Sequence, residues 1–211
     1  SFSRRQRQMC IRDRLKGDPL PGSLGFGGIE TLNALAVDGS VPVIQMDGVD
    51  IRMDRELFAD APGGVVEVRE STIRVGDGES SASRLTLTGD EVVVGEGTHL
   101  KAEQASGGGT IEVGGSWQNS DVAVRQAKRA VVEAGAVLDA SAGDVGDGGE
   151  IVVWSDINDS ESQTLVSGAL RARGGKDHGD GGRIETSGFM LDVYGIPVSY
   201  THLRAHETAY Y

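Results

Sequence analysis

The stretch DGGEIVVWSD, residues Asp147–Asp156, decides the fold, because near-copies of its first half occur twice more in the chain. These copies are GGGTIEVGG at Gly107–Gly115 and DGGRIETSG at Asp180–Gly188. Each copy contains Gly-Gly-x-Ile, and none of them has a nucleophile, a base or a set of metal ligands beside it. A short motif that recurs without attached chemistry indicates a structural repeat. We therefore expect function to lie on a long surface and not in a pocket.

The three motifs belong to longer windows that share Val, a glycine, Leu, Ala, a Gly/Asp-rich turn and Gly-Gly-x-Ile. The Leu anchors are separated by 38 and 32 residues, and the Ile anchors by 40 and 33. Periods of this length are typical of solenoids and propellers. A fainter copy, PGGVVEV, lies upstream at Pro62–Val68. The windows are Val93–Gly115, Val132–Asp156 and Val166–Gly188, with anchors Leu100, Leu138, Leu170, Ile111, Ile151 and Ile184.

Short strands fill these windows. Runs such as TIEV, AVLDA and EIVVW alternate with turn residues, and only Gln126–Ala136 hints at a helical period. The turns are long and differ in length between copies, whereas the hairpins of a propeller blade favour two-residue turns. The pattern therefore favours an all-β parallel β-helix over an antiparallel propeller. We predict parallel strands at 65–68, 110–113, 150–154 and 183–186, with no helix longer than about two turns.

The alternation of residues along these strands predicts which side chains point inward. Ile151 and Val153 should stack on Ile111 and Val113 one coil away, at the ~4.8 Å spacing of neighbouring strands. An aspartate at position 151 would then bury a carboxylate without a partner and unfold the solenoid locally. Asp147 lies in a turn of variable length, so we expect Asp147→Asn to have little effect.

Glycines and alanines are expected to shape the corners of each coil. Gly148–Gly149 and Gly181–Gly182 precede strands, and we predict that they supply positive φ angles at the corner. Small inward residues should let each corner close tightly. They are Ala102, Ala140 and Ala172.

Composition and charge exclude several classes of protein. The chain has 211 residues with 32 glycines, 20 Lys+Arg and 32 Asp+Glu, giving a formal net charge of −12. This acidity argues against nucleic acid and anionic membranes as partners. The only cysteine, Cys10, lies near the amino end, and no apolar run reaches the ~18 residues of a membrane span.

The two ends differ in texture from the rest of the chain. RRQRQMCIRDR (Arg4–Arg14) and VSYTHLRAHET (Val198–Thr208) resemble in-frame translations of the two transposase adapters used to prepare sequencing libraries. We therefore expect an internal fragment of a longer protein, of metagenomic origin. The predicted division is 1–14 as a non-native adapter, 15–61 as unplaced chain with possible further coils, 62–197 as β-helix repeats, and 198–211 as a second adapter.

The central motifs resemble a known family. GGSWQNSDVAVRQA is followed by VEAGAVLDASAGDVGDGGEIVVWSD and LRARGGKDHGDGGRIETSG, an order that is similar to filamentous haemagglutinin-like exoproteins of two-partner secretion. The resemblance covers Gly107 to about Val193 well and 62–106 more loosely. It implies a right-handed parallel β-helix that an outer-membrane partner transporter secretes from a Gram-negative bacterium. It also implies an adhesive shaft, secreted or displayed at the cell surface, that binds protein or glycan receptors on host cells or other surfaces.

The Gly/Asp-rich turns suggest calcium, but they depart from the calcium-roll pattern GGxGxDxUx. We interpret their aspartates as solvated turn residues that cap their own backbone, and keep a calcium-binding β-solenoid as an alternative. These aspartates are Asp144, Asp147, Asp177 and Asp180.

A polysaccharide-acting enzyme is the other alternative, because such activities are common on β-helices. These enzymes need clustered carboxylates beside a Lys, Arg or His. Trp117 and Trp154 could form a platform for sugars, although covering a coil edge or filling a loop fold is the favoured role for each. Nothing in the sequence pairs the other candidates, so we predict no enzyme and no catalytic, cofactor-binding or metal-binding residue. Those candidates are Asp139, Asp156, Asp192, His99, His178, Lys101, Lys128 and Lys176.

Overall fold

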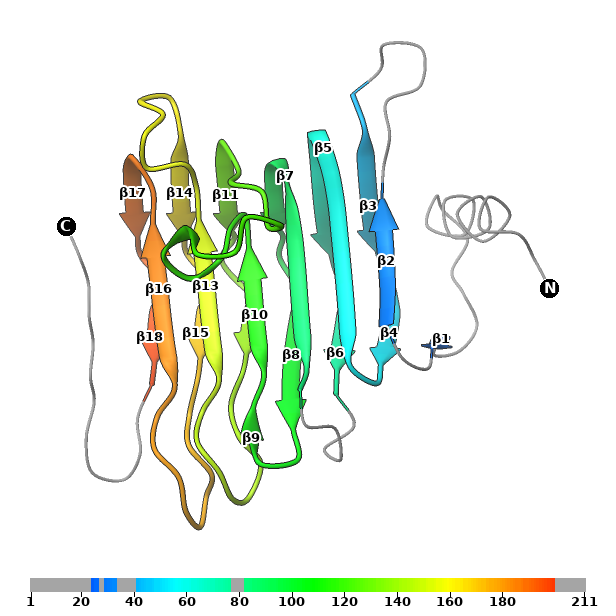
Figure 1. The fold of residues 1–211 in the computed structure, drawn as a ribbon, viewed down its shortest axis with the longest axis vertical. Helices are drawn as coiled ribbons and strands as arrows, with labels where there is room; N and C mark the ends of the chain where they lie inside the picture. Colours follow the sequence, from blue (N-terminus) through cyan, green and yellow to red (C-terminus); the bar gives the residue numbers. More distant parts are fainter. Residues whose placement is uncertain (1–23, 27–28, 34–40, 77–81, 200–211) are drawn as a thin grey trace.

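The computed structural model describes residues 24–26, 29–33, 41–76 and 82–199. Apart from one 3-10 turn, η1 (Trp117–Asn119), the regular structure of these residues is all strand. Figure 1 shows the strands stacked side by side from one end of the molecule to the other. The predicted all-β parallel β-helix is confirmed, since the pairings that stack one coil on the next are parallel.

The coil has three faces. The first face consists of β1 (Leu24–Phe26), β4 (Asp50–Met53), β6 (Thr72–Val75), β8 (His99–Gln104), β12 (Val137–Asp139), β15 (Ala169–Arg171) and β18 (Ile196–Val198). The second face holds β2 (Ile29–Asn33), β10 (Thr110–Val113), β13 (Glu150–Trp154) and β16 (Arg183–Ser187). The third holds β3 (Val43–Asp47), β11 (Arg129–Val132), β14 (Gln163–Val166) and β17 (Met190–Val193). Two long strands, β5 (Glu56–Arg69) and β7 (Arg84–Val94), cross both the second and third faces, and β9 (Gly107–Gly108) pairs antiparallel with β8.

One pass over the three faces is one coil, and we number the coils along the chain. Coil 1 is β1–β3, coil 2 is β4–β5, and coil 3 is β6–β7. Coil 4 contains β8 to β11, coil 5 contains β12–β14, and coil 6 contains β15–β17. The repeat unit thus has a third strand, which lies between each Ile anchor and the following Leu anchor.

The predicted anchors stack in register. Leu138 pairs with Leu100 and Leu170 on the first face, and Ile151 pairs with Ile111 and Ile184 on the second. The predicted strands at 110–113, 150–154 and 183–186 all lie on the second face. The core therefore runs as parallel columns of aliphatic side chains through the inside of the coils. The predicted inward residues Ile111, Val113, Ile151, Val153, Ala102, Ala140 and Ala172 are all fully buried.

The fainter copy PGGVVEV is a strand, as predicted, but it belongs to a different column. Its Val65 pairs with Glu91 of β7, on the third face. The residue of coil 3 that stacks on Ile111 is Leu85, and Leu57 of coil 2 stacks on Leu85. The true upstream equivalents lack Gly-Gly, so the glycine motif pointed to the wrong alignment.

The prediction of positive φ at the glycine pairs is wrong. None of Gly148, Gly149, Gly181 and Gly182 adopts it. Gly148, Gly149 and Gly182 are needed for close approach between coils: a Cβ on Gly149 would lie 1.9 Å from the carbonyl oxygen of Gly109, and one on Gly182 would lie 1.9 Å from that of Gly149. Neighbouring coils touch backbone to backbone at this corner, so any side chain would push them apart.

The corner between the second and third faces varies most along the stack. In coils 2 and 3 the long strands β5 and β7 pass it without a break. Coil 4 inserts the residues between Val113 and Arg129 there, and coil 5 inserts those between Trp154 and Gln163. The strands on either side keep their register, so the insertions leave the stack intact.

The predicted adapter segments fall mainly outside the described residues. Residues 1–14 and 200–211 cannot be compared with the prediction. Val198 is the last residue of β18 and pairs with Arg171, and the Ser199 hydroxyl donates to the carbonyl of Gly182 at 2.6 Å. These two residues therefore contact the solenoid.

Candidate functional site

The outer surface of the second face carries a group of charged side chains from coils 3 to 6. The pairing register places them in two neighbouring outward columns, alternating with the inward aliphatic residues. We name this group the outer-face cluster. It consists of Arg84, Glu112, Glu150, Arg183 and Glu185.

A loop folds back over this surface. Residues 115–127, which we name the strap, leave coil 4 after β10, pass over the second face, and return to β11 (Figure 1). Outward-facing side chains here are buried: Glu112 is 3% exposed, Val152 0% and Trp154 3%. The indole N–H of Trp154 donates to the side-chain oxygen of Gln126 in the strap at 2.9 Å. The second face is therefore dry on both sides where the strap covers it.

The strap is attached to coils other than its own. The guanidinium of Arg125 donates to both carboxylate oxygens of Asp60 in coil 2, at 3.1 and 3.3 Å. In coil 3, the hydroxyl of Thr88 donates to the backbone oxygen of Arg125 at 2.8 Å. In coil 6, Glu185 accepts the backbone N–H of Gln118 at 2.8 Å. Together with Trp154 of coil 5, these contacts join the strap to four coils besides coil 4.

The strap has a strained backbone. Gln118 and Asn119 lie in the left-handed region, with φ of 48° and 52°. Non-glycine residues in this region cost on the order of 1 kcal/mol each, and they persist only where the surroundings fix them. Asp121 helps to fix the turn, since its N–H donates to the Ser116 hydroxyl and its carboxylate accepts the N–H of Ala123, both at 3.0 Å.

Arg84 links the strap to the buried part of the outer-face cluster. It donates to Glu112 at 2.9 Å and to Asp121 at 2.8 Å, and the hydroxyl of Thr86 donates to Glu112 at 2.8 Å. Burial raises the pKa of Glu112, although Arg84 opposes the change. The pKa of Asp121 is lowered, because Arg84 and a backbone N–H donate to its carboxylate. The pKa values of two carboxylates that share one arginine thus shift in opposite directions, because desolvation dominates at Glu112 and hydrogen bonds dominate at Asp121.

Arg183 organises the more open part of the cluster. It donates to Glu150 at 2.5 Å, and its guanidinium carbon lies 4.5 Å from the ring centroid of Trp117 in the strap, a cation–π contact. Burial raises the pKa values of Glu150 and Glu185. The cluster thus contains two arginine–glutamate pairs, Arg84–Glu112 and Arg183–Glu150, while Glu185 binds the strap backbone.

Sequence reasoning missed these glutamates. Glu112, Glu150 and Glu185 occur in different copies of the motif: Glu112 and Glu185 directly follow their Ile anchors, whereas Glu150 directly precedes its anchor. They come together only because the coils stack diagonally neighbouring positions, which are about 7–8 Å apart. The sequence did contain one signal for them: a charged residue stands next to each Ile anchor, at a position that alternation along the strand turns outward.

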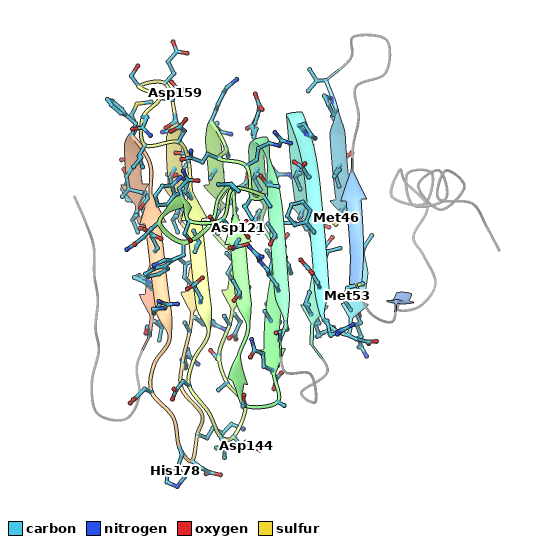
Figure 2. All side chains as sticks on the ribbon, in the orientation of Figure 1. Met46, Met53, Asp121, Asp144, Asp159 and His178 are labelled. Carbon is cyan, nitrogen blue, oxygen red and sulfur yellow. The ribbon has the colours of Figure 1, made fainter. Side chains whose placement is uncertain are left out.

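The four turn aspartates contact other groups of their own and neighbouring turns. Asp144 pairs with Lys176 at 3.0 Å, and Asp147 accepts the backbone N–H of Asp180 at 2.6 Å. The turns of coils 5 and 6 lie against each other, and Figure 2 shows Asp144 and His178 together at their tips, far from Asp121 in the strap. In the part of the chain that the structure describes, no group of three or more His, Cys, Asp or Glu could hold a metal ion.

The carboxylates weighed for catalysis are dispersed. Asp139, on the first face, accepts the N–H of Ser141 at 2.9 Å. Asp156 accepts the N–H of Asn158 at 2.9 Å in the coil 5 insertion, and Asp192 is exposed on β17 of the third face. The fold does not bring these three together.

The candidate histidines and lysines are likewise separate. His99 is exposed on the first face, whereas His178 lies at a turn tip. Lys101 pairs with Glu103 at 2.5 Å, and Lys128 with Asp90 at 2.7 Å. Lys176 pairs with Asp144. Each of these lysines thus contacts a carboxylate near its own coil.

The two tryptophans do not make a sugar platform. Trp154 is buried beneath the strap and donates to Gln126 of that loop. Trp117 is half-buried, and Arg183 lies over one side of its ring.

Comparison with known proteins shows a likeness in fold. No family model matches the chain, and no curated protein matches its sequence. Among solved structures, the secretion domain of HMW1 from Haemophilus influenzae superposes with a TM-score of 0.52 at 21% sequence identity. The superposition covers 72% of this chain and 45% of that one, so the chain matches less than half of that structure.

Within the described residues, no helix has the length and apolarity needed to cross a membrane.

Proposed function

We propose that this chain is part of the β-helix shaft of a large exoprotein of two-partner secretion, exported through an outer-membrane partner transporter of a Gram-negative bacterium and used for attachment. The observation that carries the proposal is the parallel β-helix with its likeness to a secretion domain over 72% of the chain. The order of the sequence motifs supports it independently. Secretion or surface display is the location that suits both observations.

The outer surface of the stack suits a long exposed shaft. Charged side chains on neighbouring coils pair with opposite charges, as in Asp90–Lys128 at 2.7 Å and Asp144–Lys176 at 3.0 Å. Such pairs contribute little to stability, but they keep the surface polar along its length. A rigid rod with a solvated surface can hold a binding region away from the cell that displays it.

Adhesion is tested with the chain coupled to fluorescent beads, which are counted after they bind to cultured epithelial cells. Beads that carry the chain should bind in clear excess over beads that carry the Ile151→Asp variant, whose coil stack is broken. Equal numbers would contradict an adhesive role for these coils.

Export is tested by deletion of the transporter gene adjacent to the gene of the parent protein. The deletion should abolish secretion of the parent protein, and unchanged secretion would contradict the two-partner route.

The same proposal includes the absence of catalysis. The carboxylates of the outer-face cluster accept hydrogen bonds from Arg84, Arg183, Thr86 and the strap backbone, and the strap covers part of the surface. Incubation with carboxylated, sulfated and neutral polysaccharides should release no reducing ends.

Calcium and chelator should leave the melting temperature unchanged, because Lys176 and a backbone N–H already satisfy two of the turn aspartates.

A further inference from the structure

The strap joins coils that do not touch one another. In a solenoid each coil contacts only its neighbours, so opening at one end normally spreads by nearest-neighbour steps. The strap contacts Asp60 of coil 2 through Arg125, and Glu185 of coil 6 through Gln118. It thereby connects coils that are four positions apart, through a segment that belongs to coil 4.

The anchors of the strap form one connected network. Arg84 binds Glu112 of coil 4 and Asp121 of the strap, and Asp121 in turn fixes the strap turn through Ser116. At the other end, Arg183 binds Glu150 of coil 5 and lies over Trp117. A displacement of coil 2 or coil 6 therefore pulls on contacts that other coils share.

The strained backbone supports a bracing role. Two successive residues, Gln118 and Asn119, are held at positive φ where the strap meets coil 6. A loop that only connected two strands would relax from this conformation, whereas a loop fixed at several points can retain it. The strap also covers Val152 and Trp154, so its detachment would expose apolar surface on coil 5.

We propose that the strap is a cross-coil brace, which makes coils 2 to 6 open as one cooperative unit. The other inserted loop, residues 155–162, provides the contrast. Its hydrogen bonds stay within coil 5 or reach only adjacent coils: the N–H of Asp156 donates to the oxygen of Ala127, and the N–H of Phe189 donates to the hydroxyl of Ser162. That loop is a matched control on the same corner of the stack.

The test is hydrogen–deuterium exchange of the full chain, read by mass spectrometry at residues 57–61 in coil 2 and 183–187 in coil 6. Replacement of 116–126 by a Gly/Ser sequence of equal length should speed exchange at both sites at least about tenfold, since sub-global opening controls exchange. The same replacement of 157–161 should leave 57–61 unchanged.

A single substitution provides a second test in case the chain with the replaced loop does not fold. Arg125→Gln removes the contact with Asp60 and leaves the rest of the strap in place. Exchange at 183–187, four coils away, should then rise about threefold. Unchanged exchange at 183–187 in Arg125→Gln would overturn the brace, as would strap replacement that affects only coils 3 to 5.

Discussion

Two arginine–glutamate pairs bridge coils on the outside of the solenoid, and their surroundings make them opposite in character. Arg84 and Glu112 lie on the second face beneath the strap, where the Glu112 side chain is 4% exposed. Arg69 and Glu133 lie on the third face, where the Glu133 side chain is 34% exposed. Both arginines bind with two nitrogens, at 2.9 and 3.1 Å in the covered pair and 2.6 and 2.8 Å in the open pair.

The pKa directions of the two glutamates record this difference. Burial raises the pKa of Glu112 despite its arginine. The pKa of Glu133 is lowered, chiefly because Arg69 donates to it. Two glutamates that each pair with an arginine therefore have pKa values shifted in opposite directions. The difference arises because the strap removes water from Glu112. The covered pair fixes the strap, whereas the open pair ties two coils at the expense of little desolvation.

The largest effect should come from breaking the stack beneath the covered pair. Ile151→Asp places a carboxylate among Ile111, Ile184 and the core, and should lower the free energy of unfolding by at least about 4 kcal/mol. Circular dichroism during urea denaturation measures this. Gln163→Asp, at an outward position of the same coil, should change stability by less than about 0.5 kcal/mol. Equal effects would show that residue 151 does not face the core.

Removal of the arginine should destabilise the protein much more in the covered pair than in the open pair. Arg84→Met leaves the Glu112 carboxylate buried without its cation and should cost about 3–5 kcal/mol. Arg69→Met leaves Glu133 in water and should cost about 1 kcal/mol or less. Urea denaturation of both variants provides the comparison, and similar losses would contradict the role assigned to the strap.

The pH dependence should differ in sign. Because the folded pKa of Glu112 is raised, its carboxylate destabilises the fold above that pKa, and the cost is relieved as the pH falls through it. Because the folded pKa of Glu133 is lowered, its stabilisation is present above its ordinary value of 4.5 and is lost as the pH falls through the lowered pKa.

Glu112→Gln and Glu133→Gln test these two trends in urea titrations from pH 7.5 to acid. On acidification, the stability of Glu112→Gln should fall relative to the unmodified chain, since that chain gains stability. Glu133→Gln should instead approach the unmodified chain. Parallel curves for the two variants would refute the comparison.

A smaller effect should follow from a methyl group under the open pair. Gly95 lies between the coils that Arg69 and Glu133 connect, and a Cβ there would meet Cγ and Nη1 of Arg69 at 2.6 Å. Gly95→Ala should displace the arginine and cost about 1 kcal/mol. In an Arg69→Ala background, which lacks both of these atoms, the same change should be nearly neutral, so an additive double mutant would contradict this contact.

The smallest effect is expected far from both pairs. Asp147→Asn keeps an oxygen that can accept the N–H of Asp180, so the free energy of unfolding should change by less than about 0.5 kcal/mol. Asp147→Ala removes that acceptor and should be the more destabilising of the two. The reverse order, or a calcium-dependent effect of Asp147→Asn, would show that the turn holds a ligand.

Short-range pattern was sufficient for the columns of the core. Ile151 stacks on Ile111 and Ile184 because alternation along a strand and a fixed spacing between strands leave one register. The same reasoning misplaced Val65, since the upstream coils reach the second face at Leu57 and Leu85 without the glycine motif. Gly149 was identified as special for the wrong reason: contact with the next coil, and not local backbone angle, excludes a side chain.

The outer-face cluster could not be predicted in this way. Arg84, Glu112 and Asp121 meet only once the lengths of two coils and the path of the strap are known. The loops differ in length between coils without moving the strand register, so sequence alone did not indicate which coil positions the strap reaches. The polar contacts between coils on the outer surface, unlike the aliphatic columns of the core, therefore do not follow from the sequence pattern alone.

The corner between the second and third faces has a practical consequence for protein engineering. Coils 2 and 3 pass it as unbroken strands, whereas coils 4 and 5 each accommodate an insertion without losing register. Foreign peptides grafted between Asn158 and Ser160 should consequently be displayed at one edge of the rod while the coils below them remain stacked. A series of such grafts on successive coils would present antigens or enzyme-recognition tags in a row, spaced by the ~4.8 Å rise of the strands.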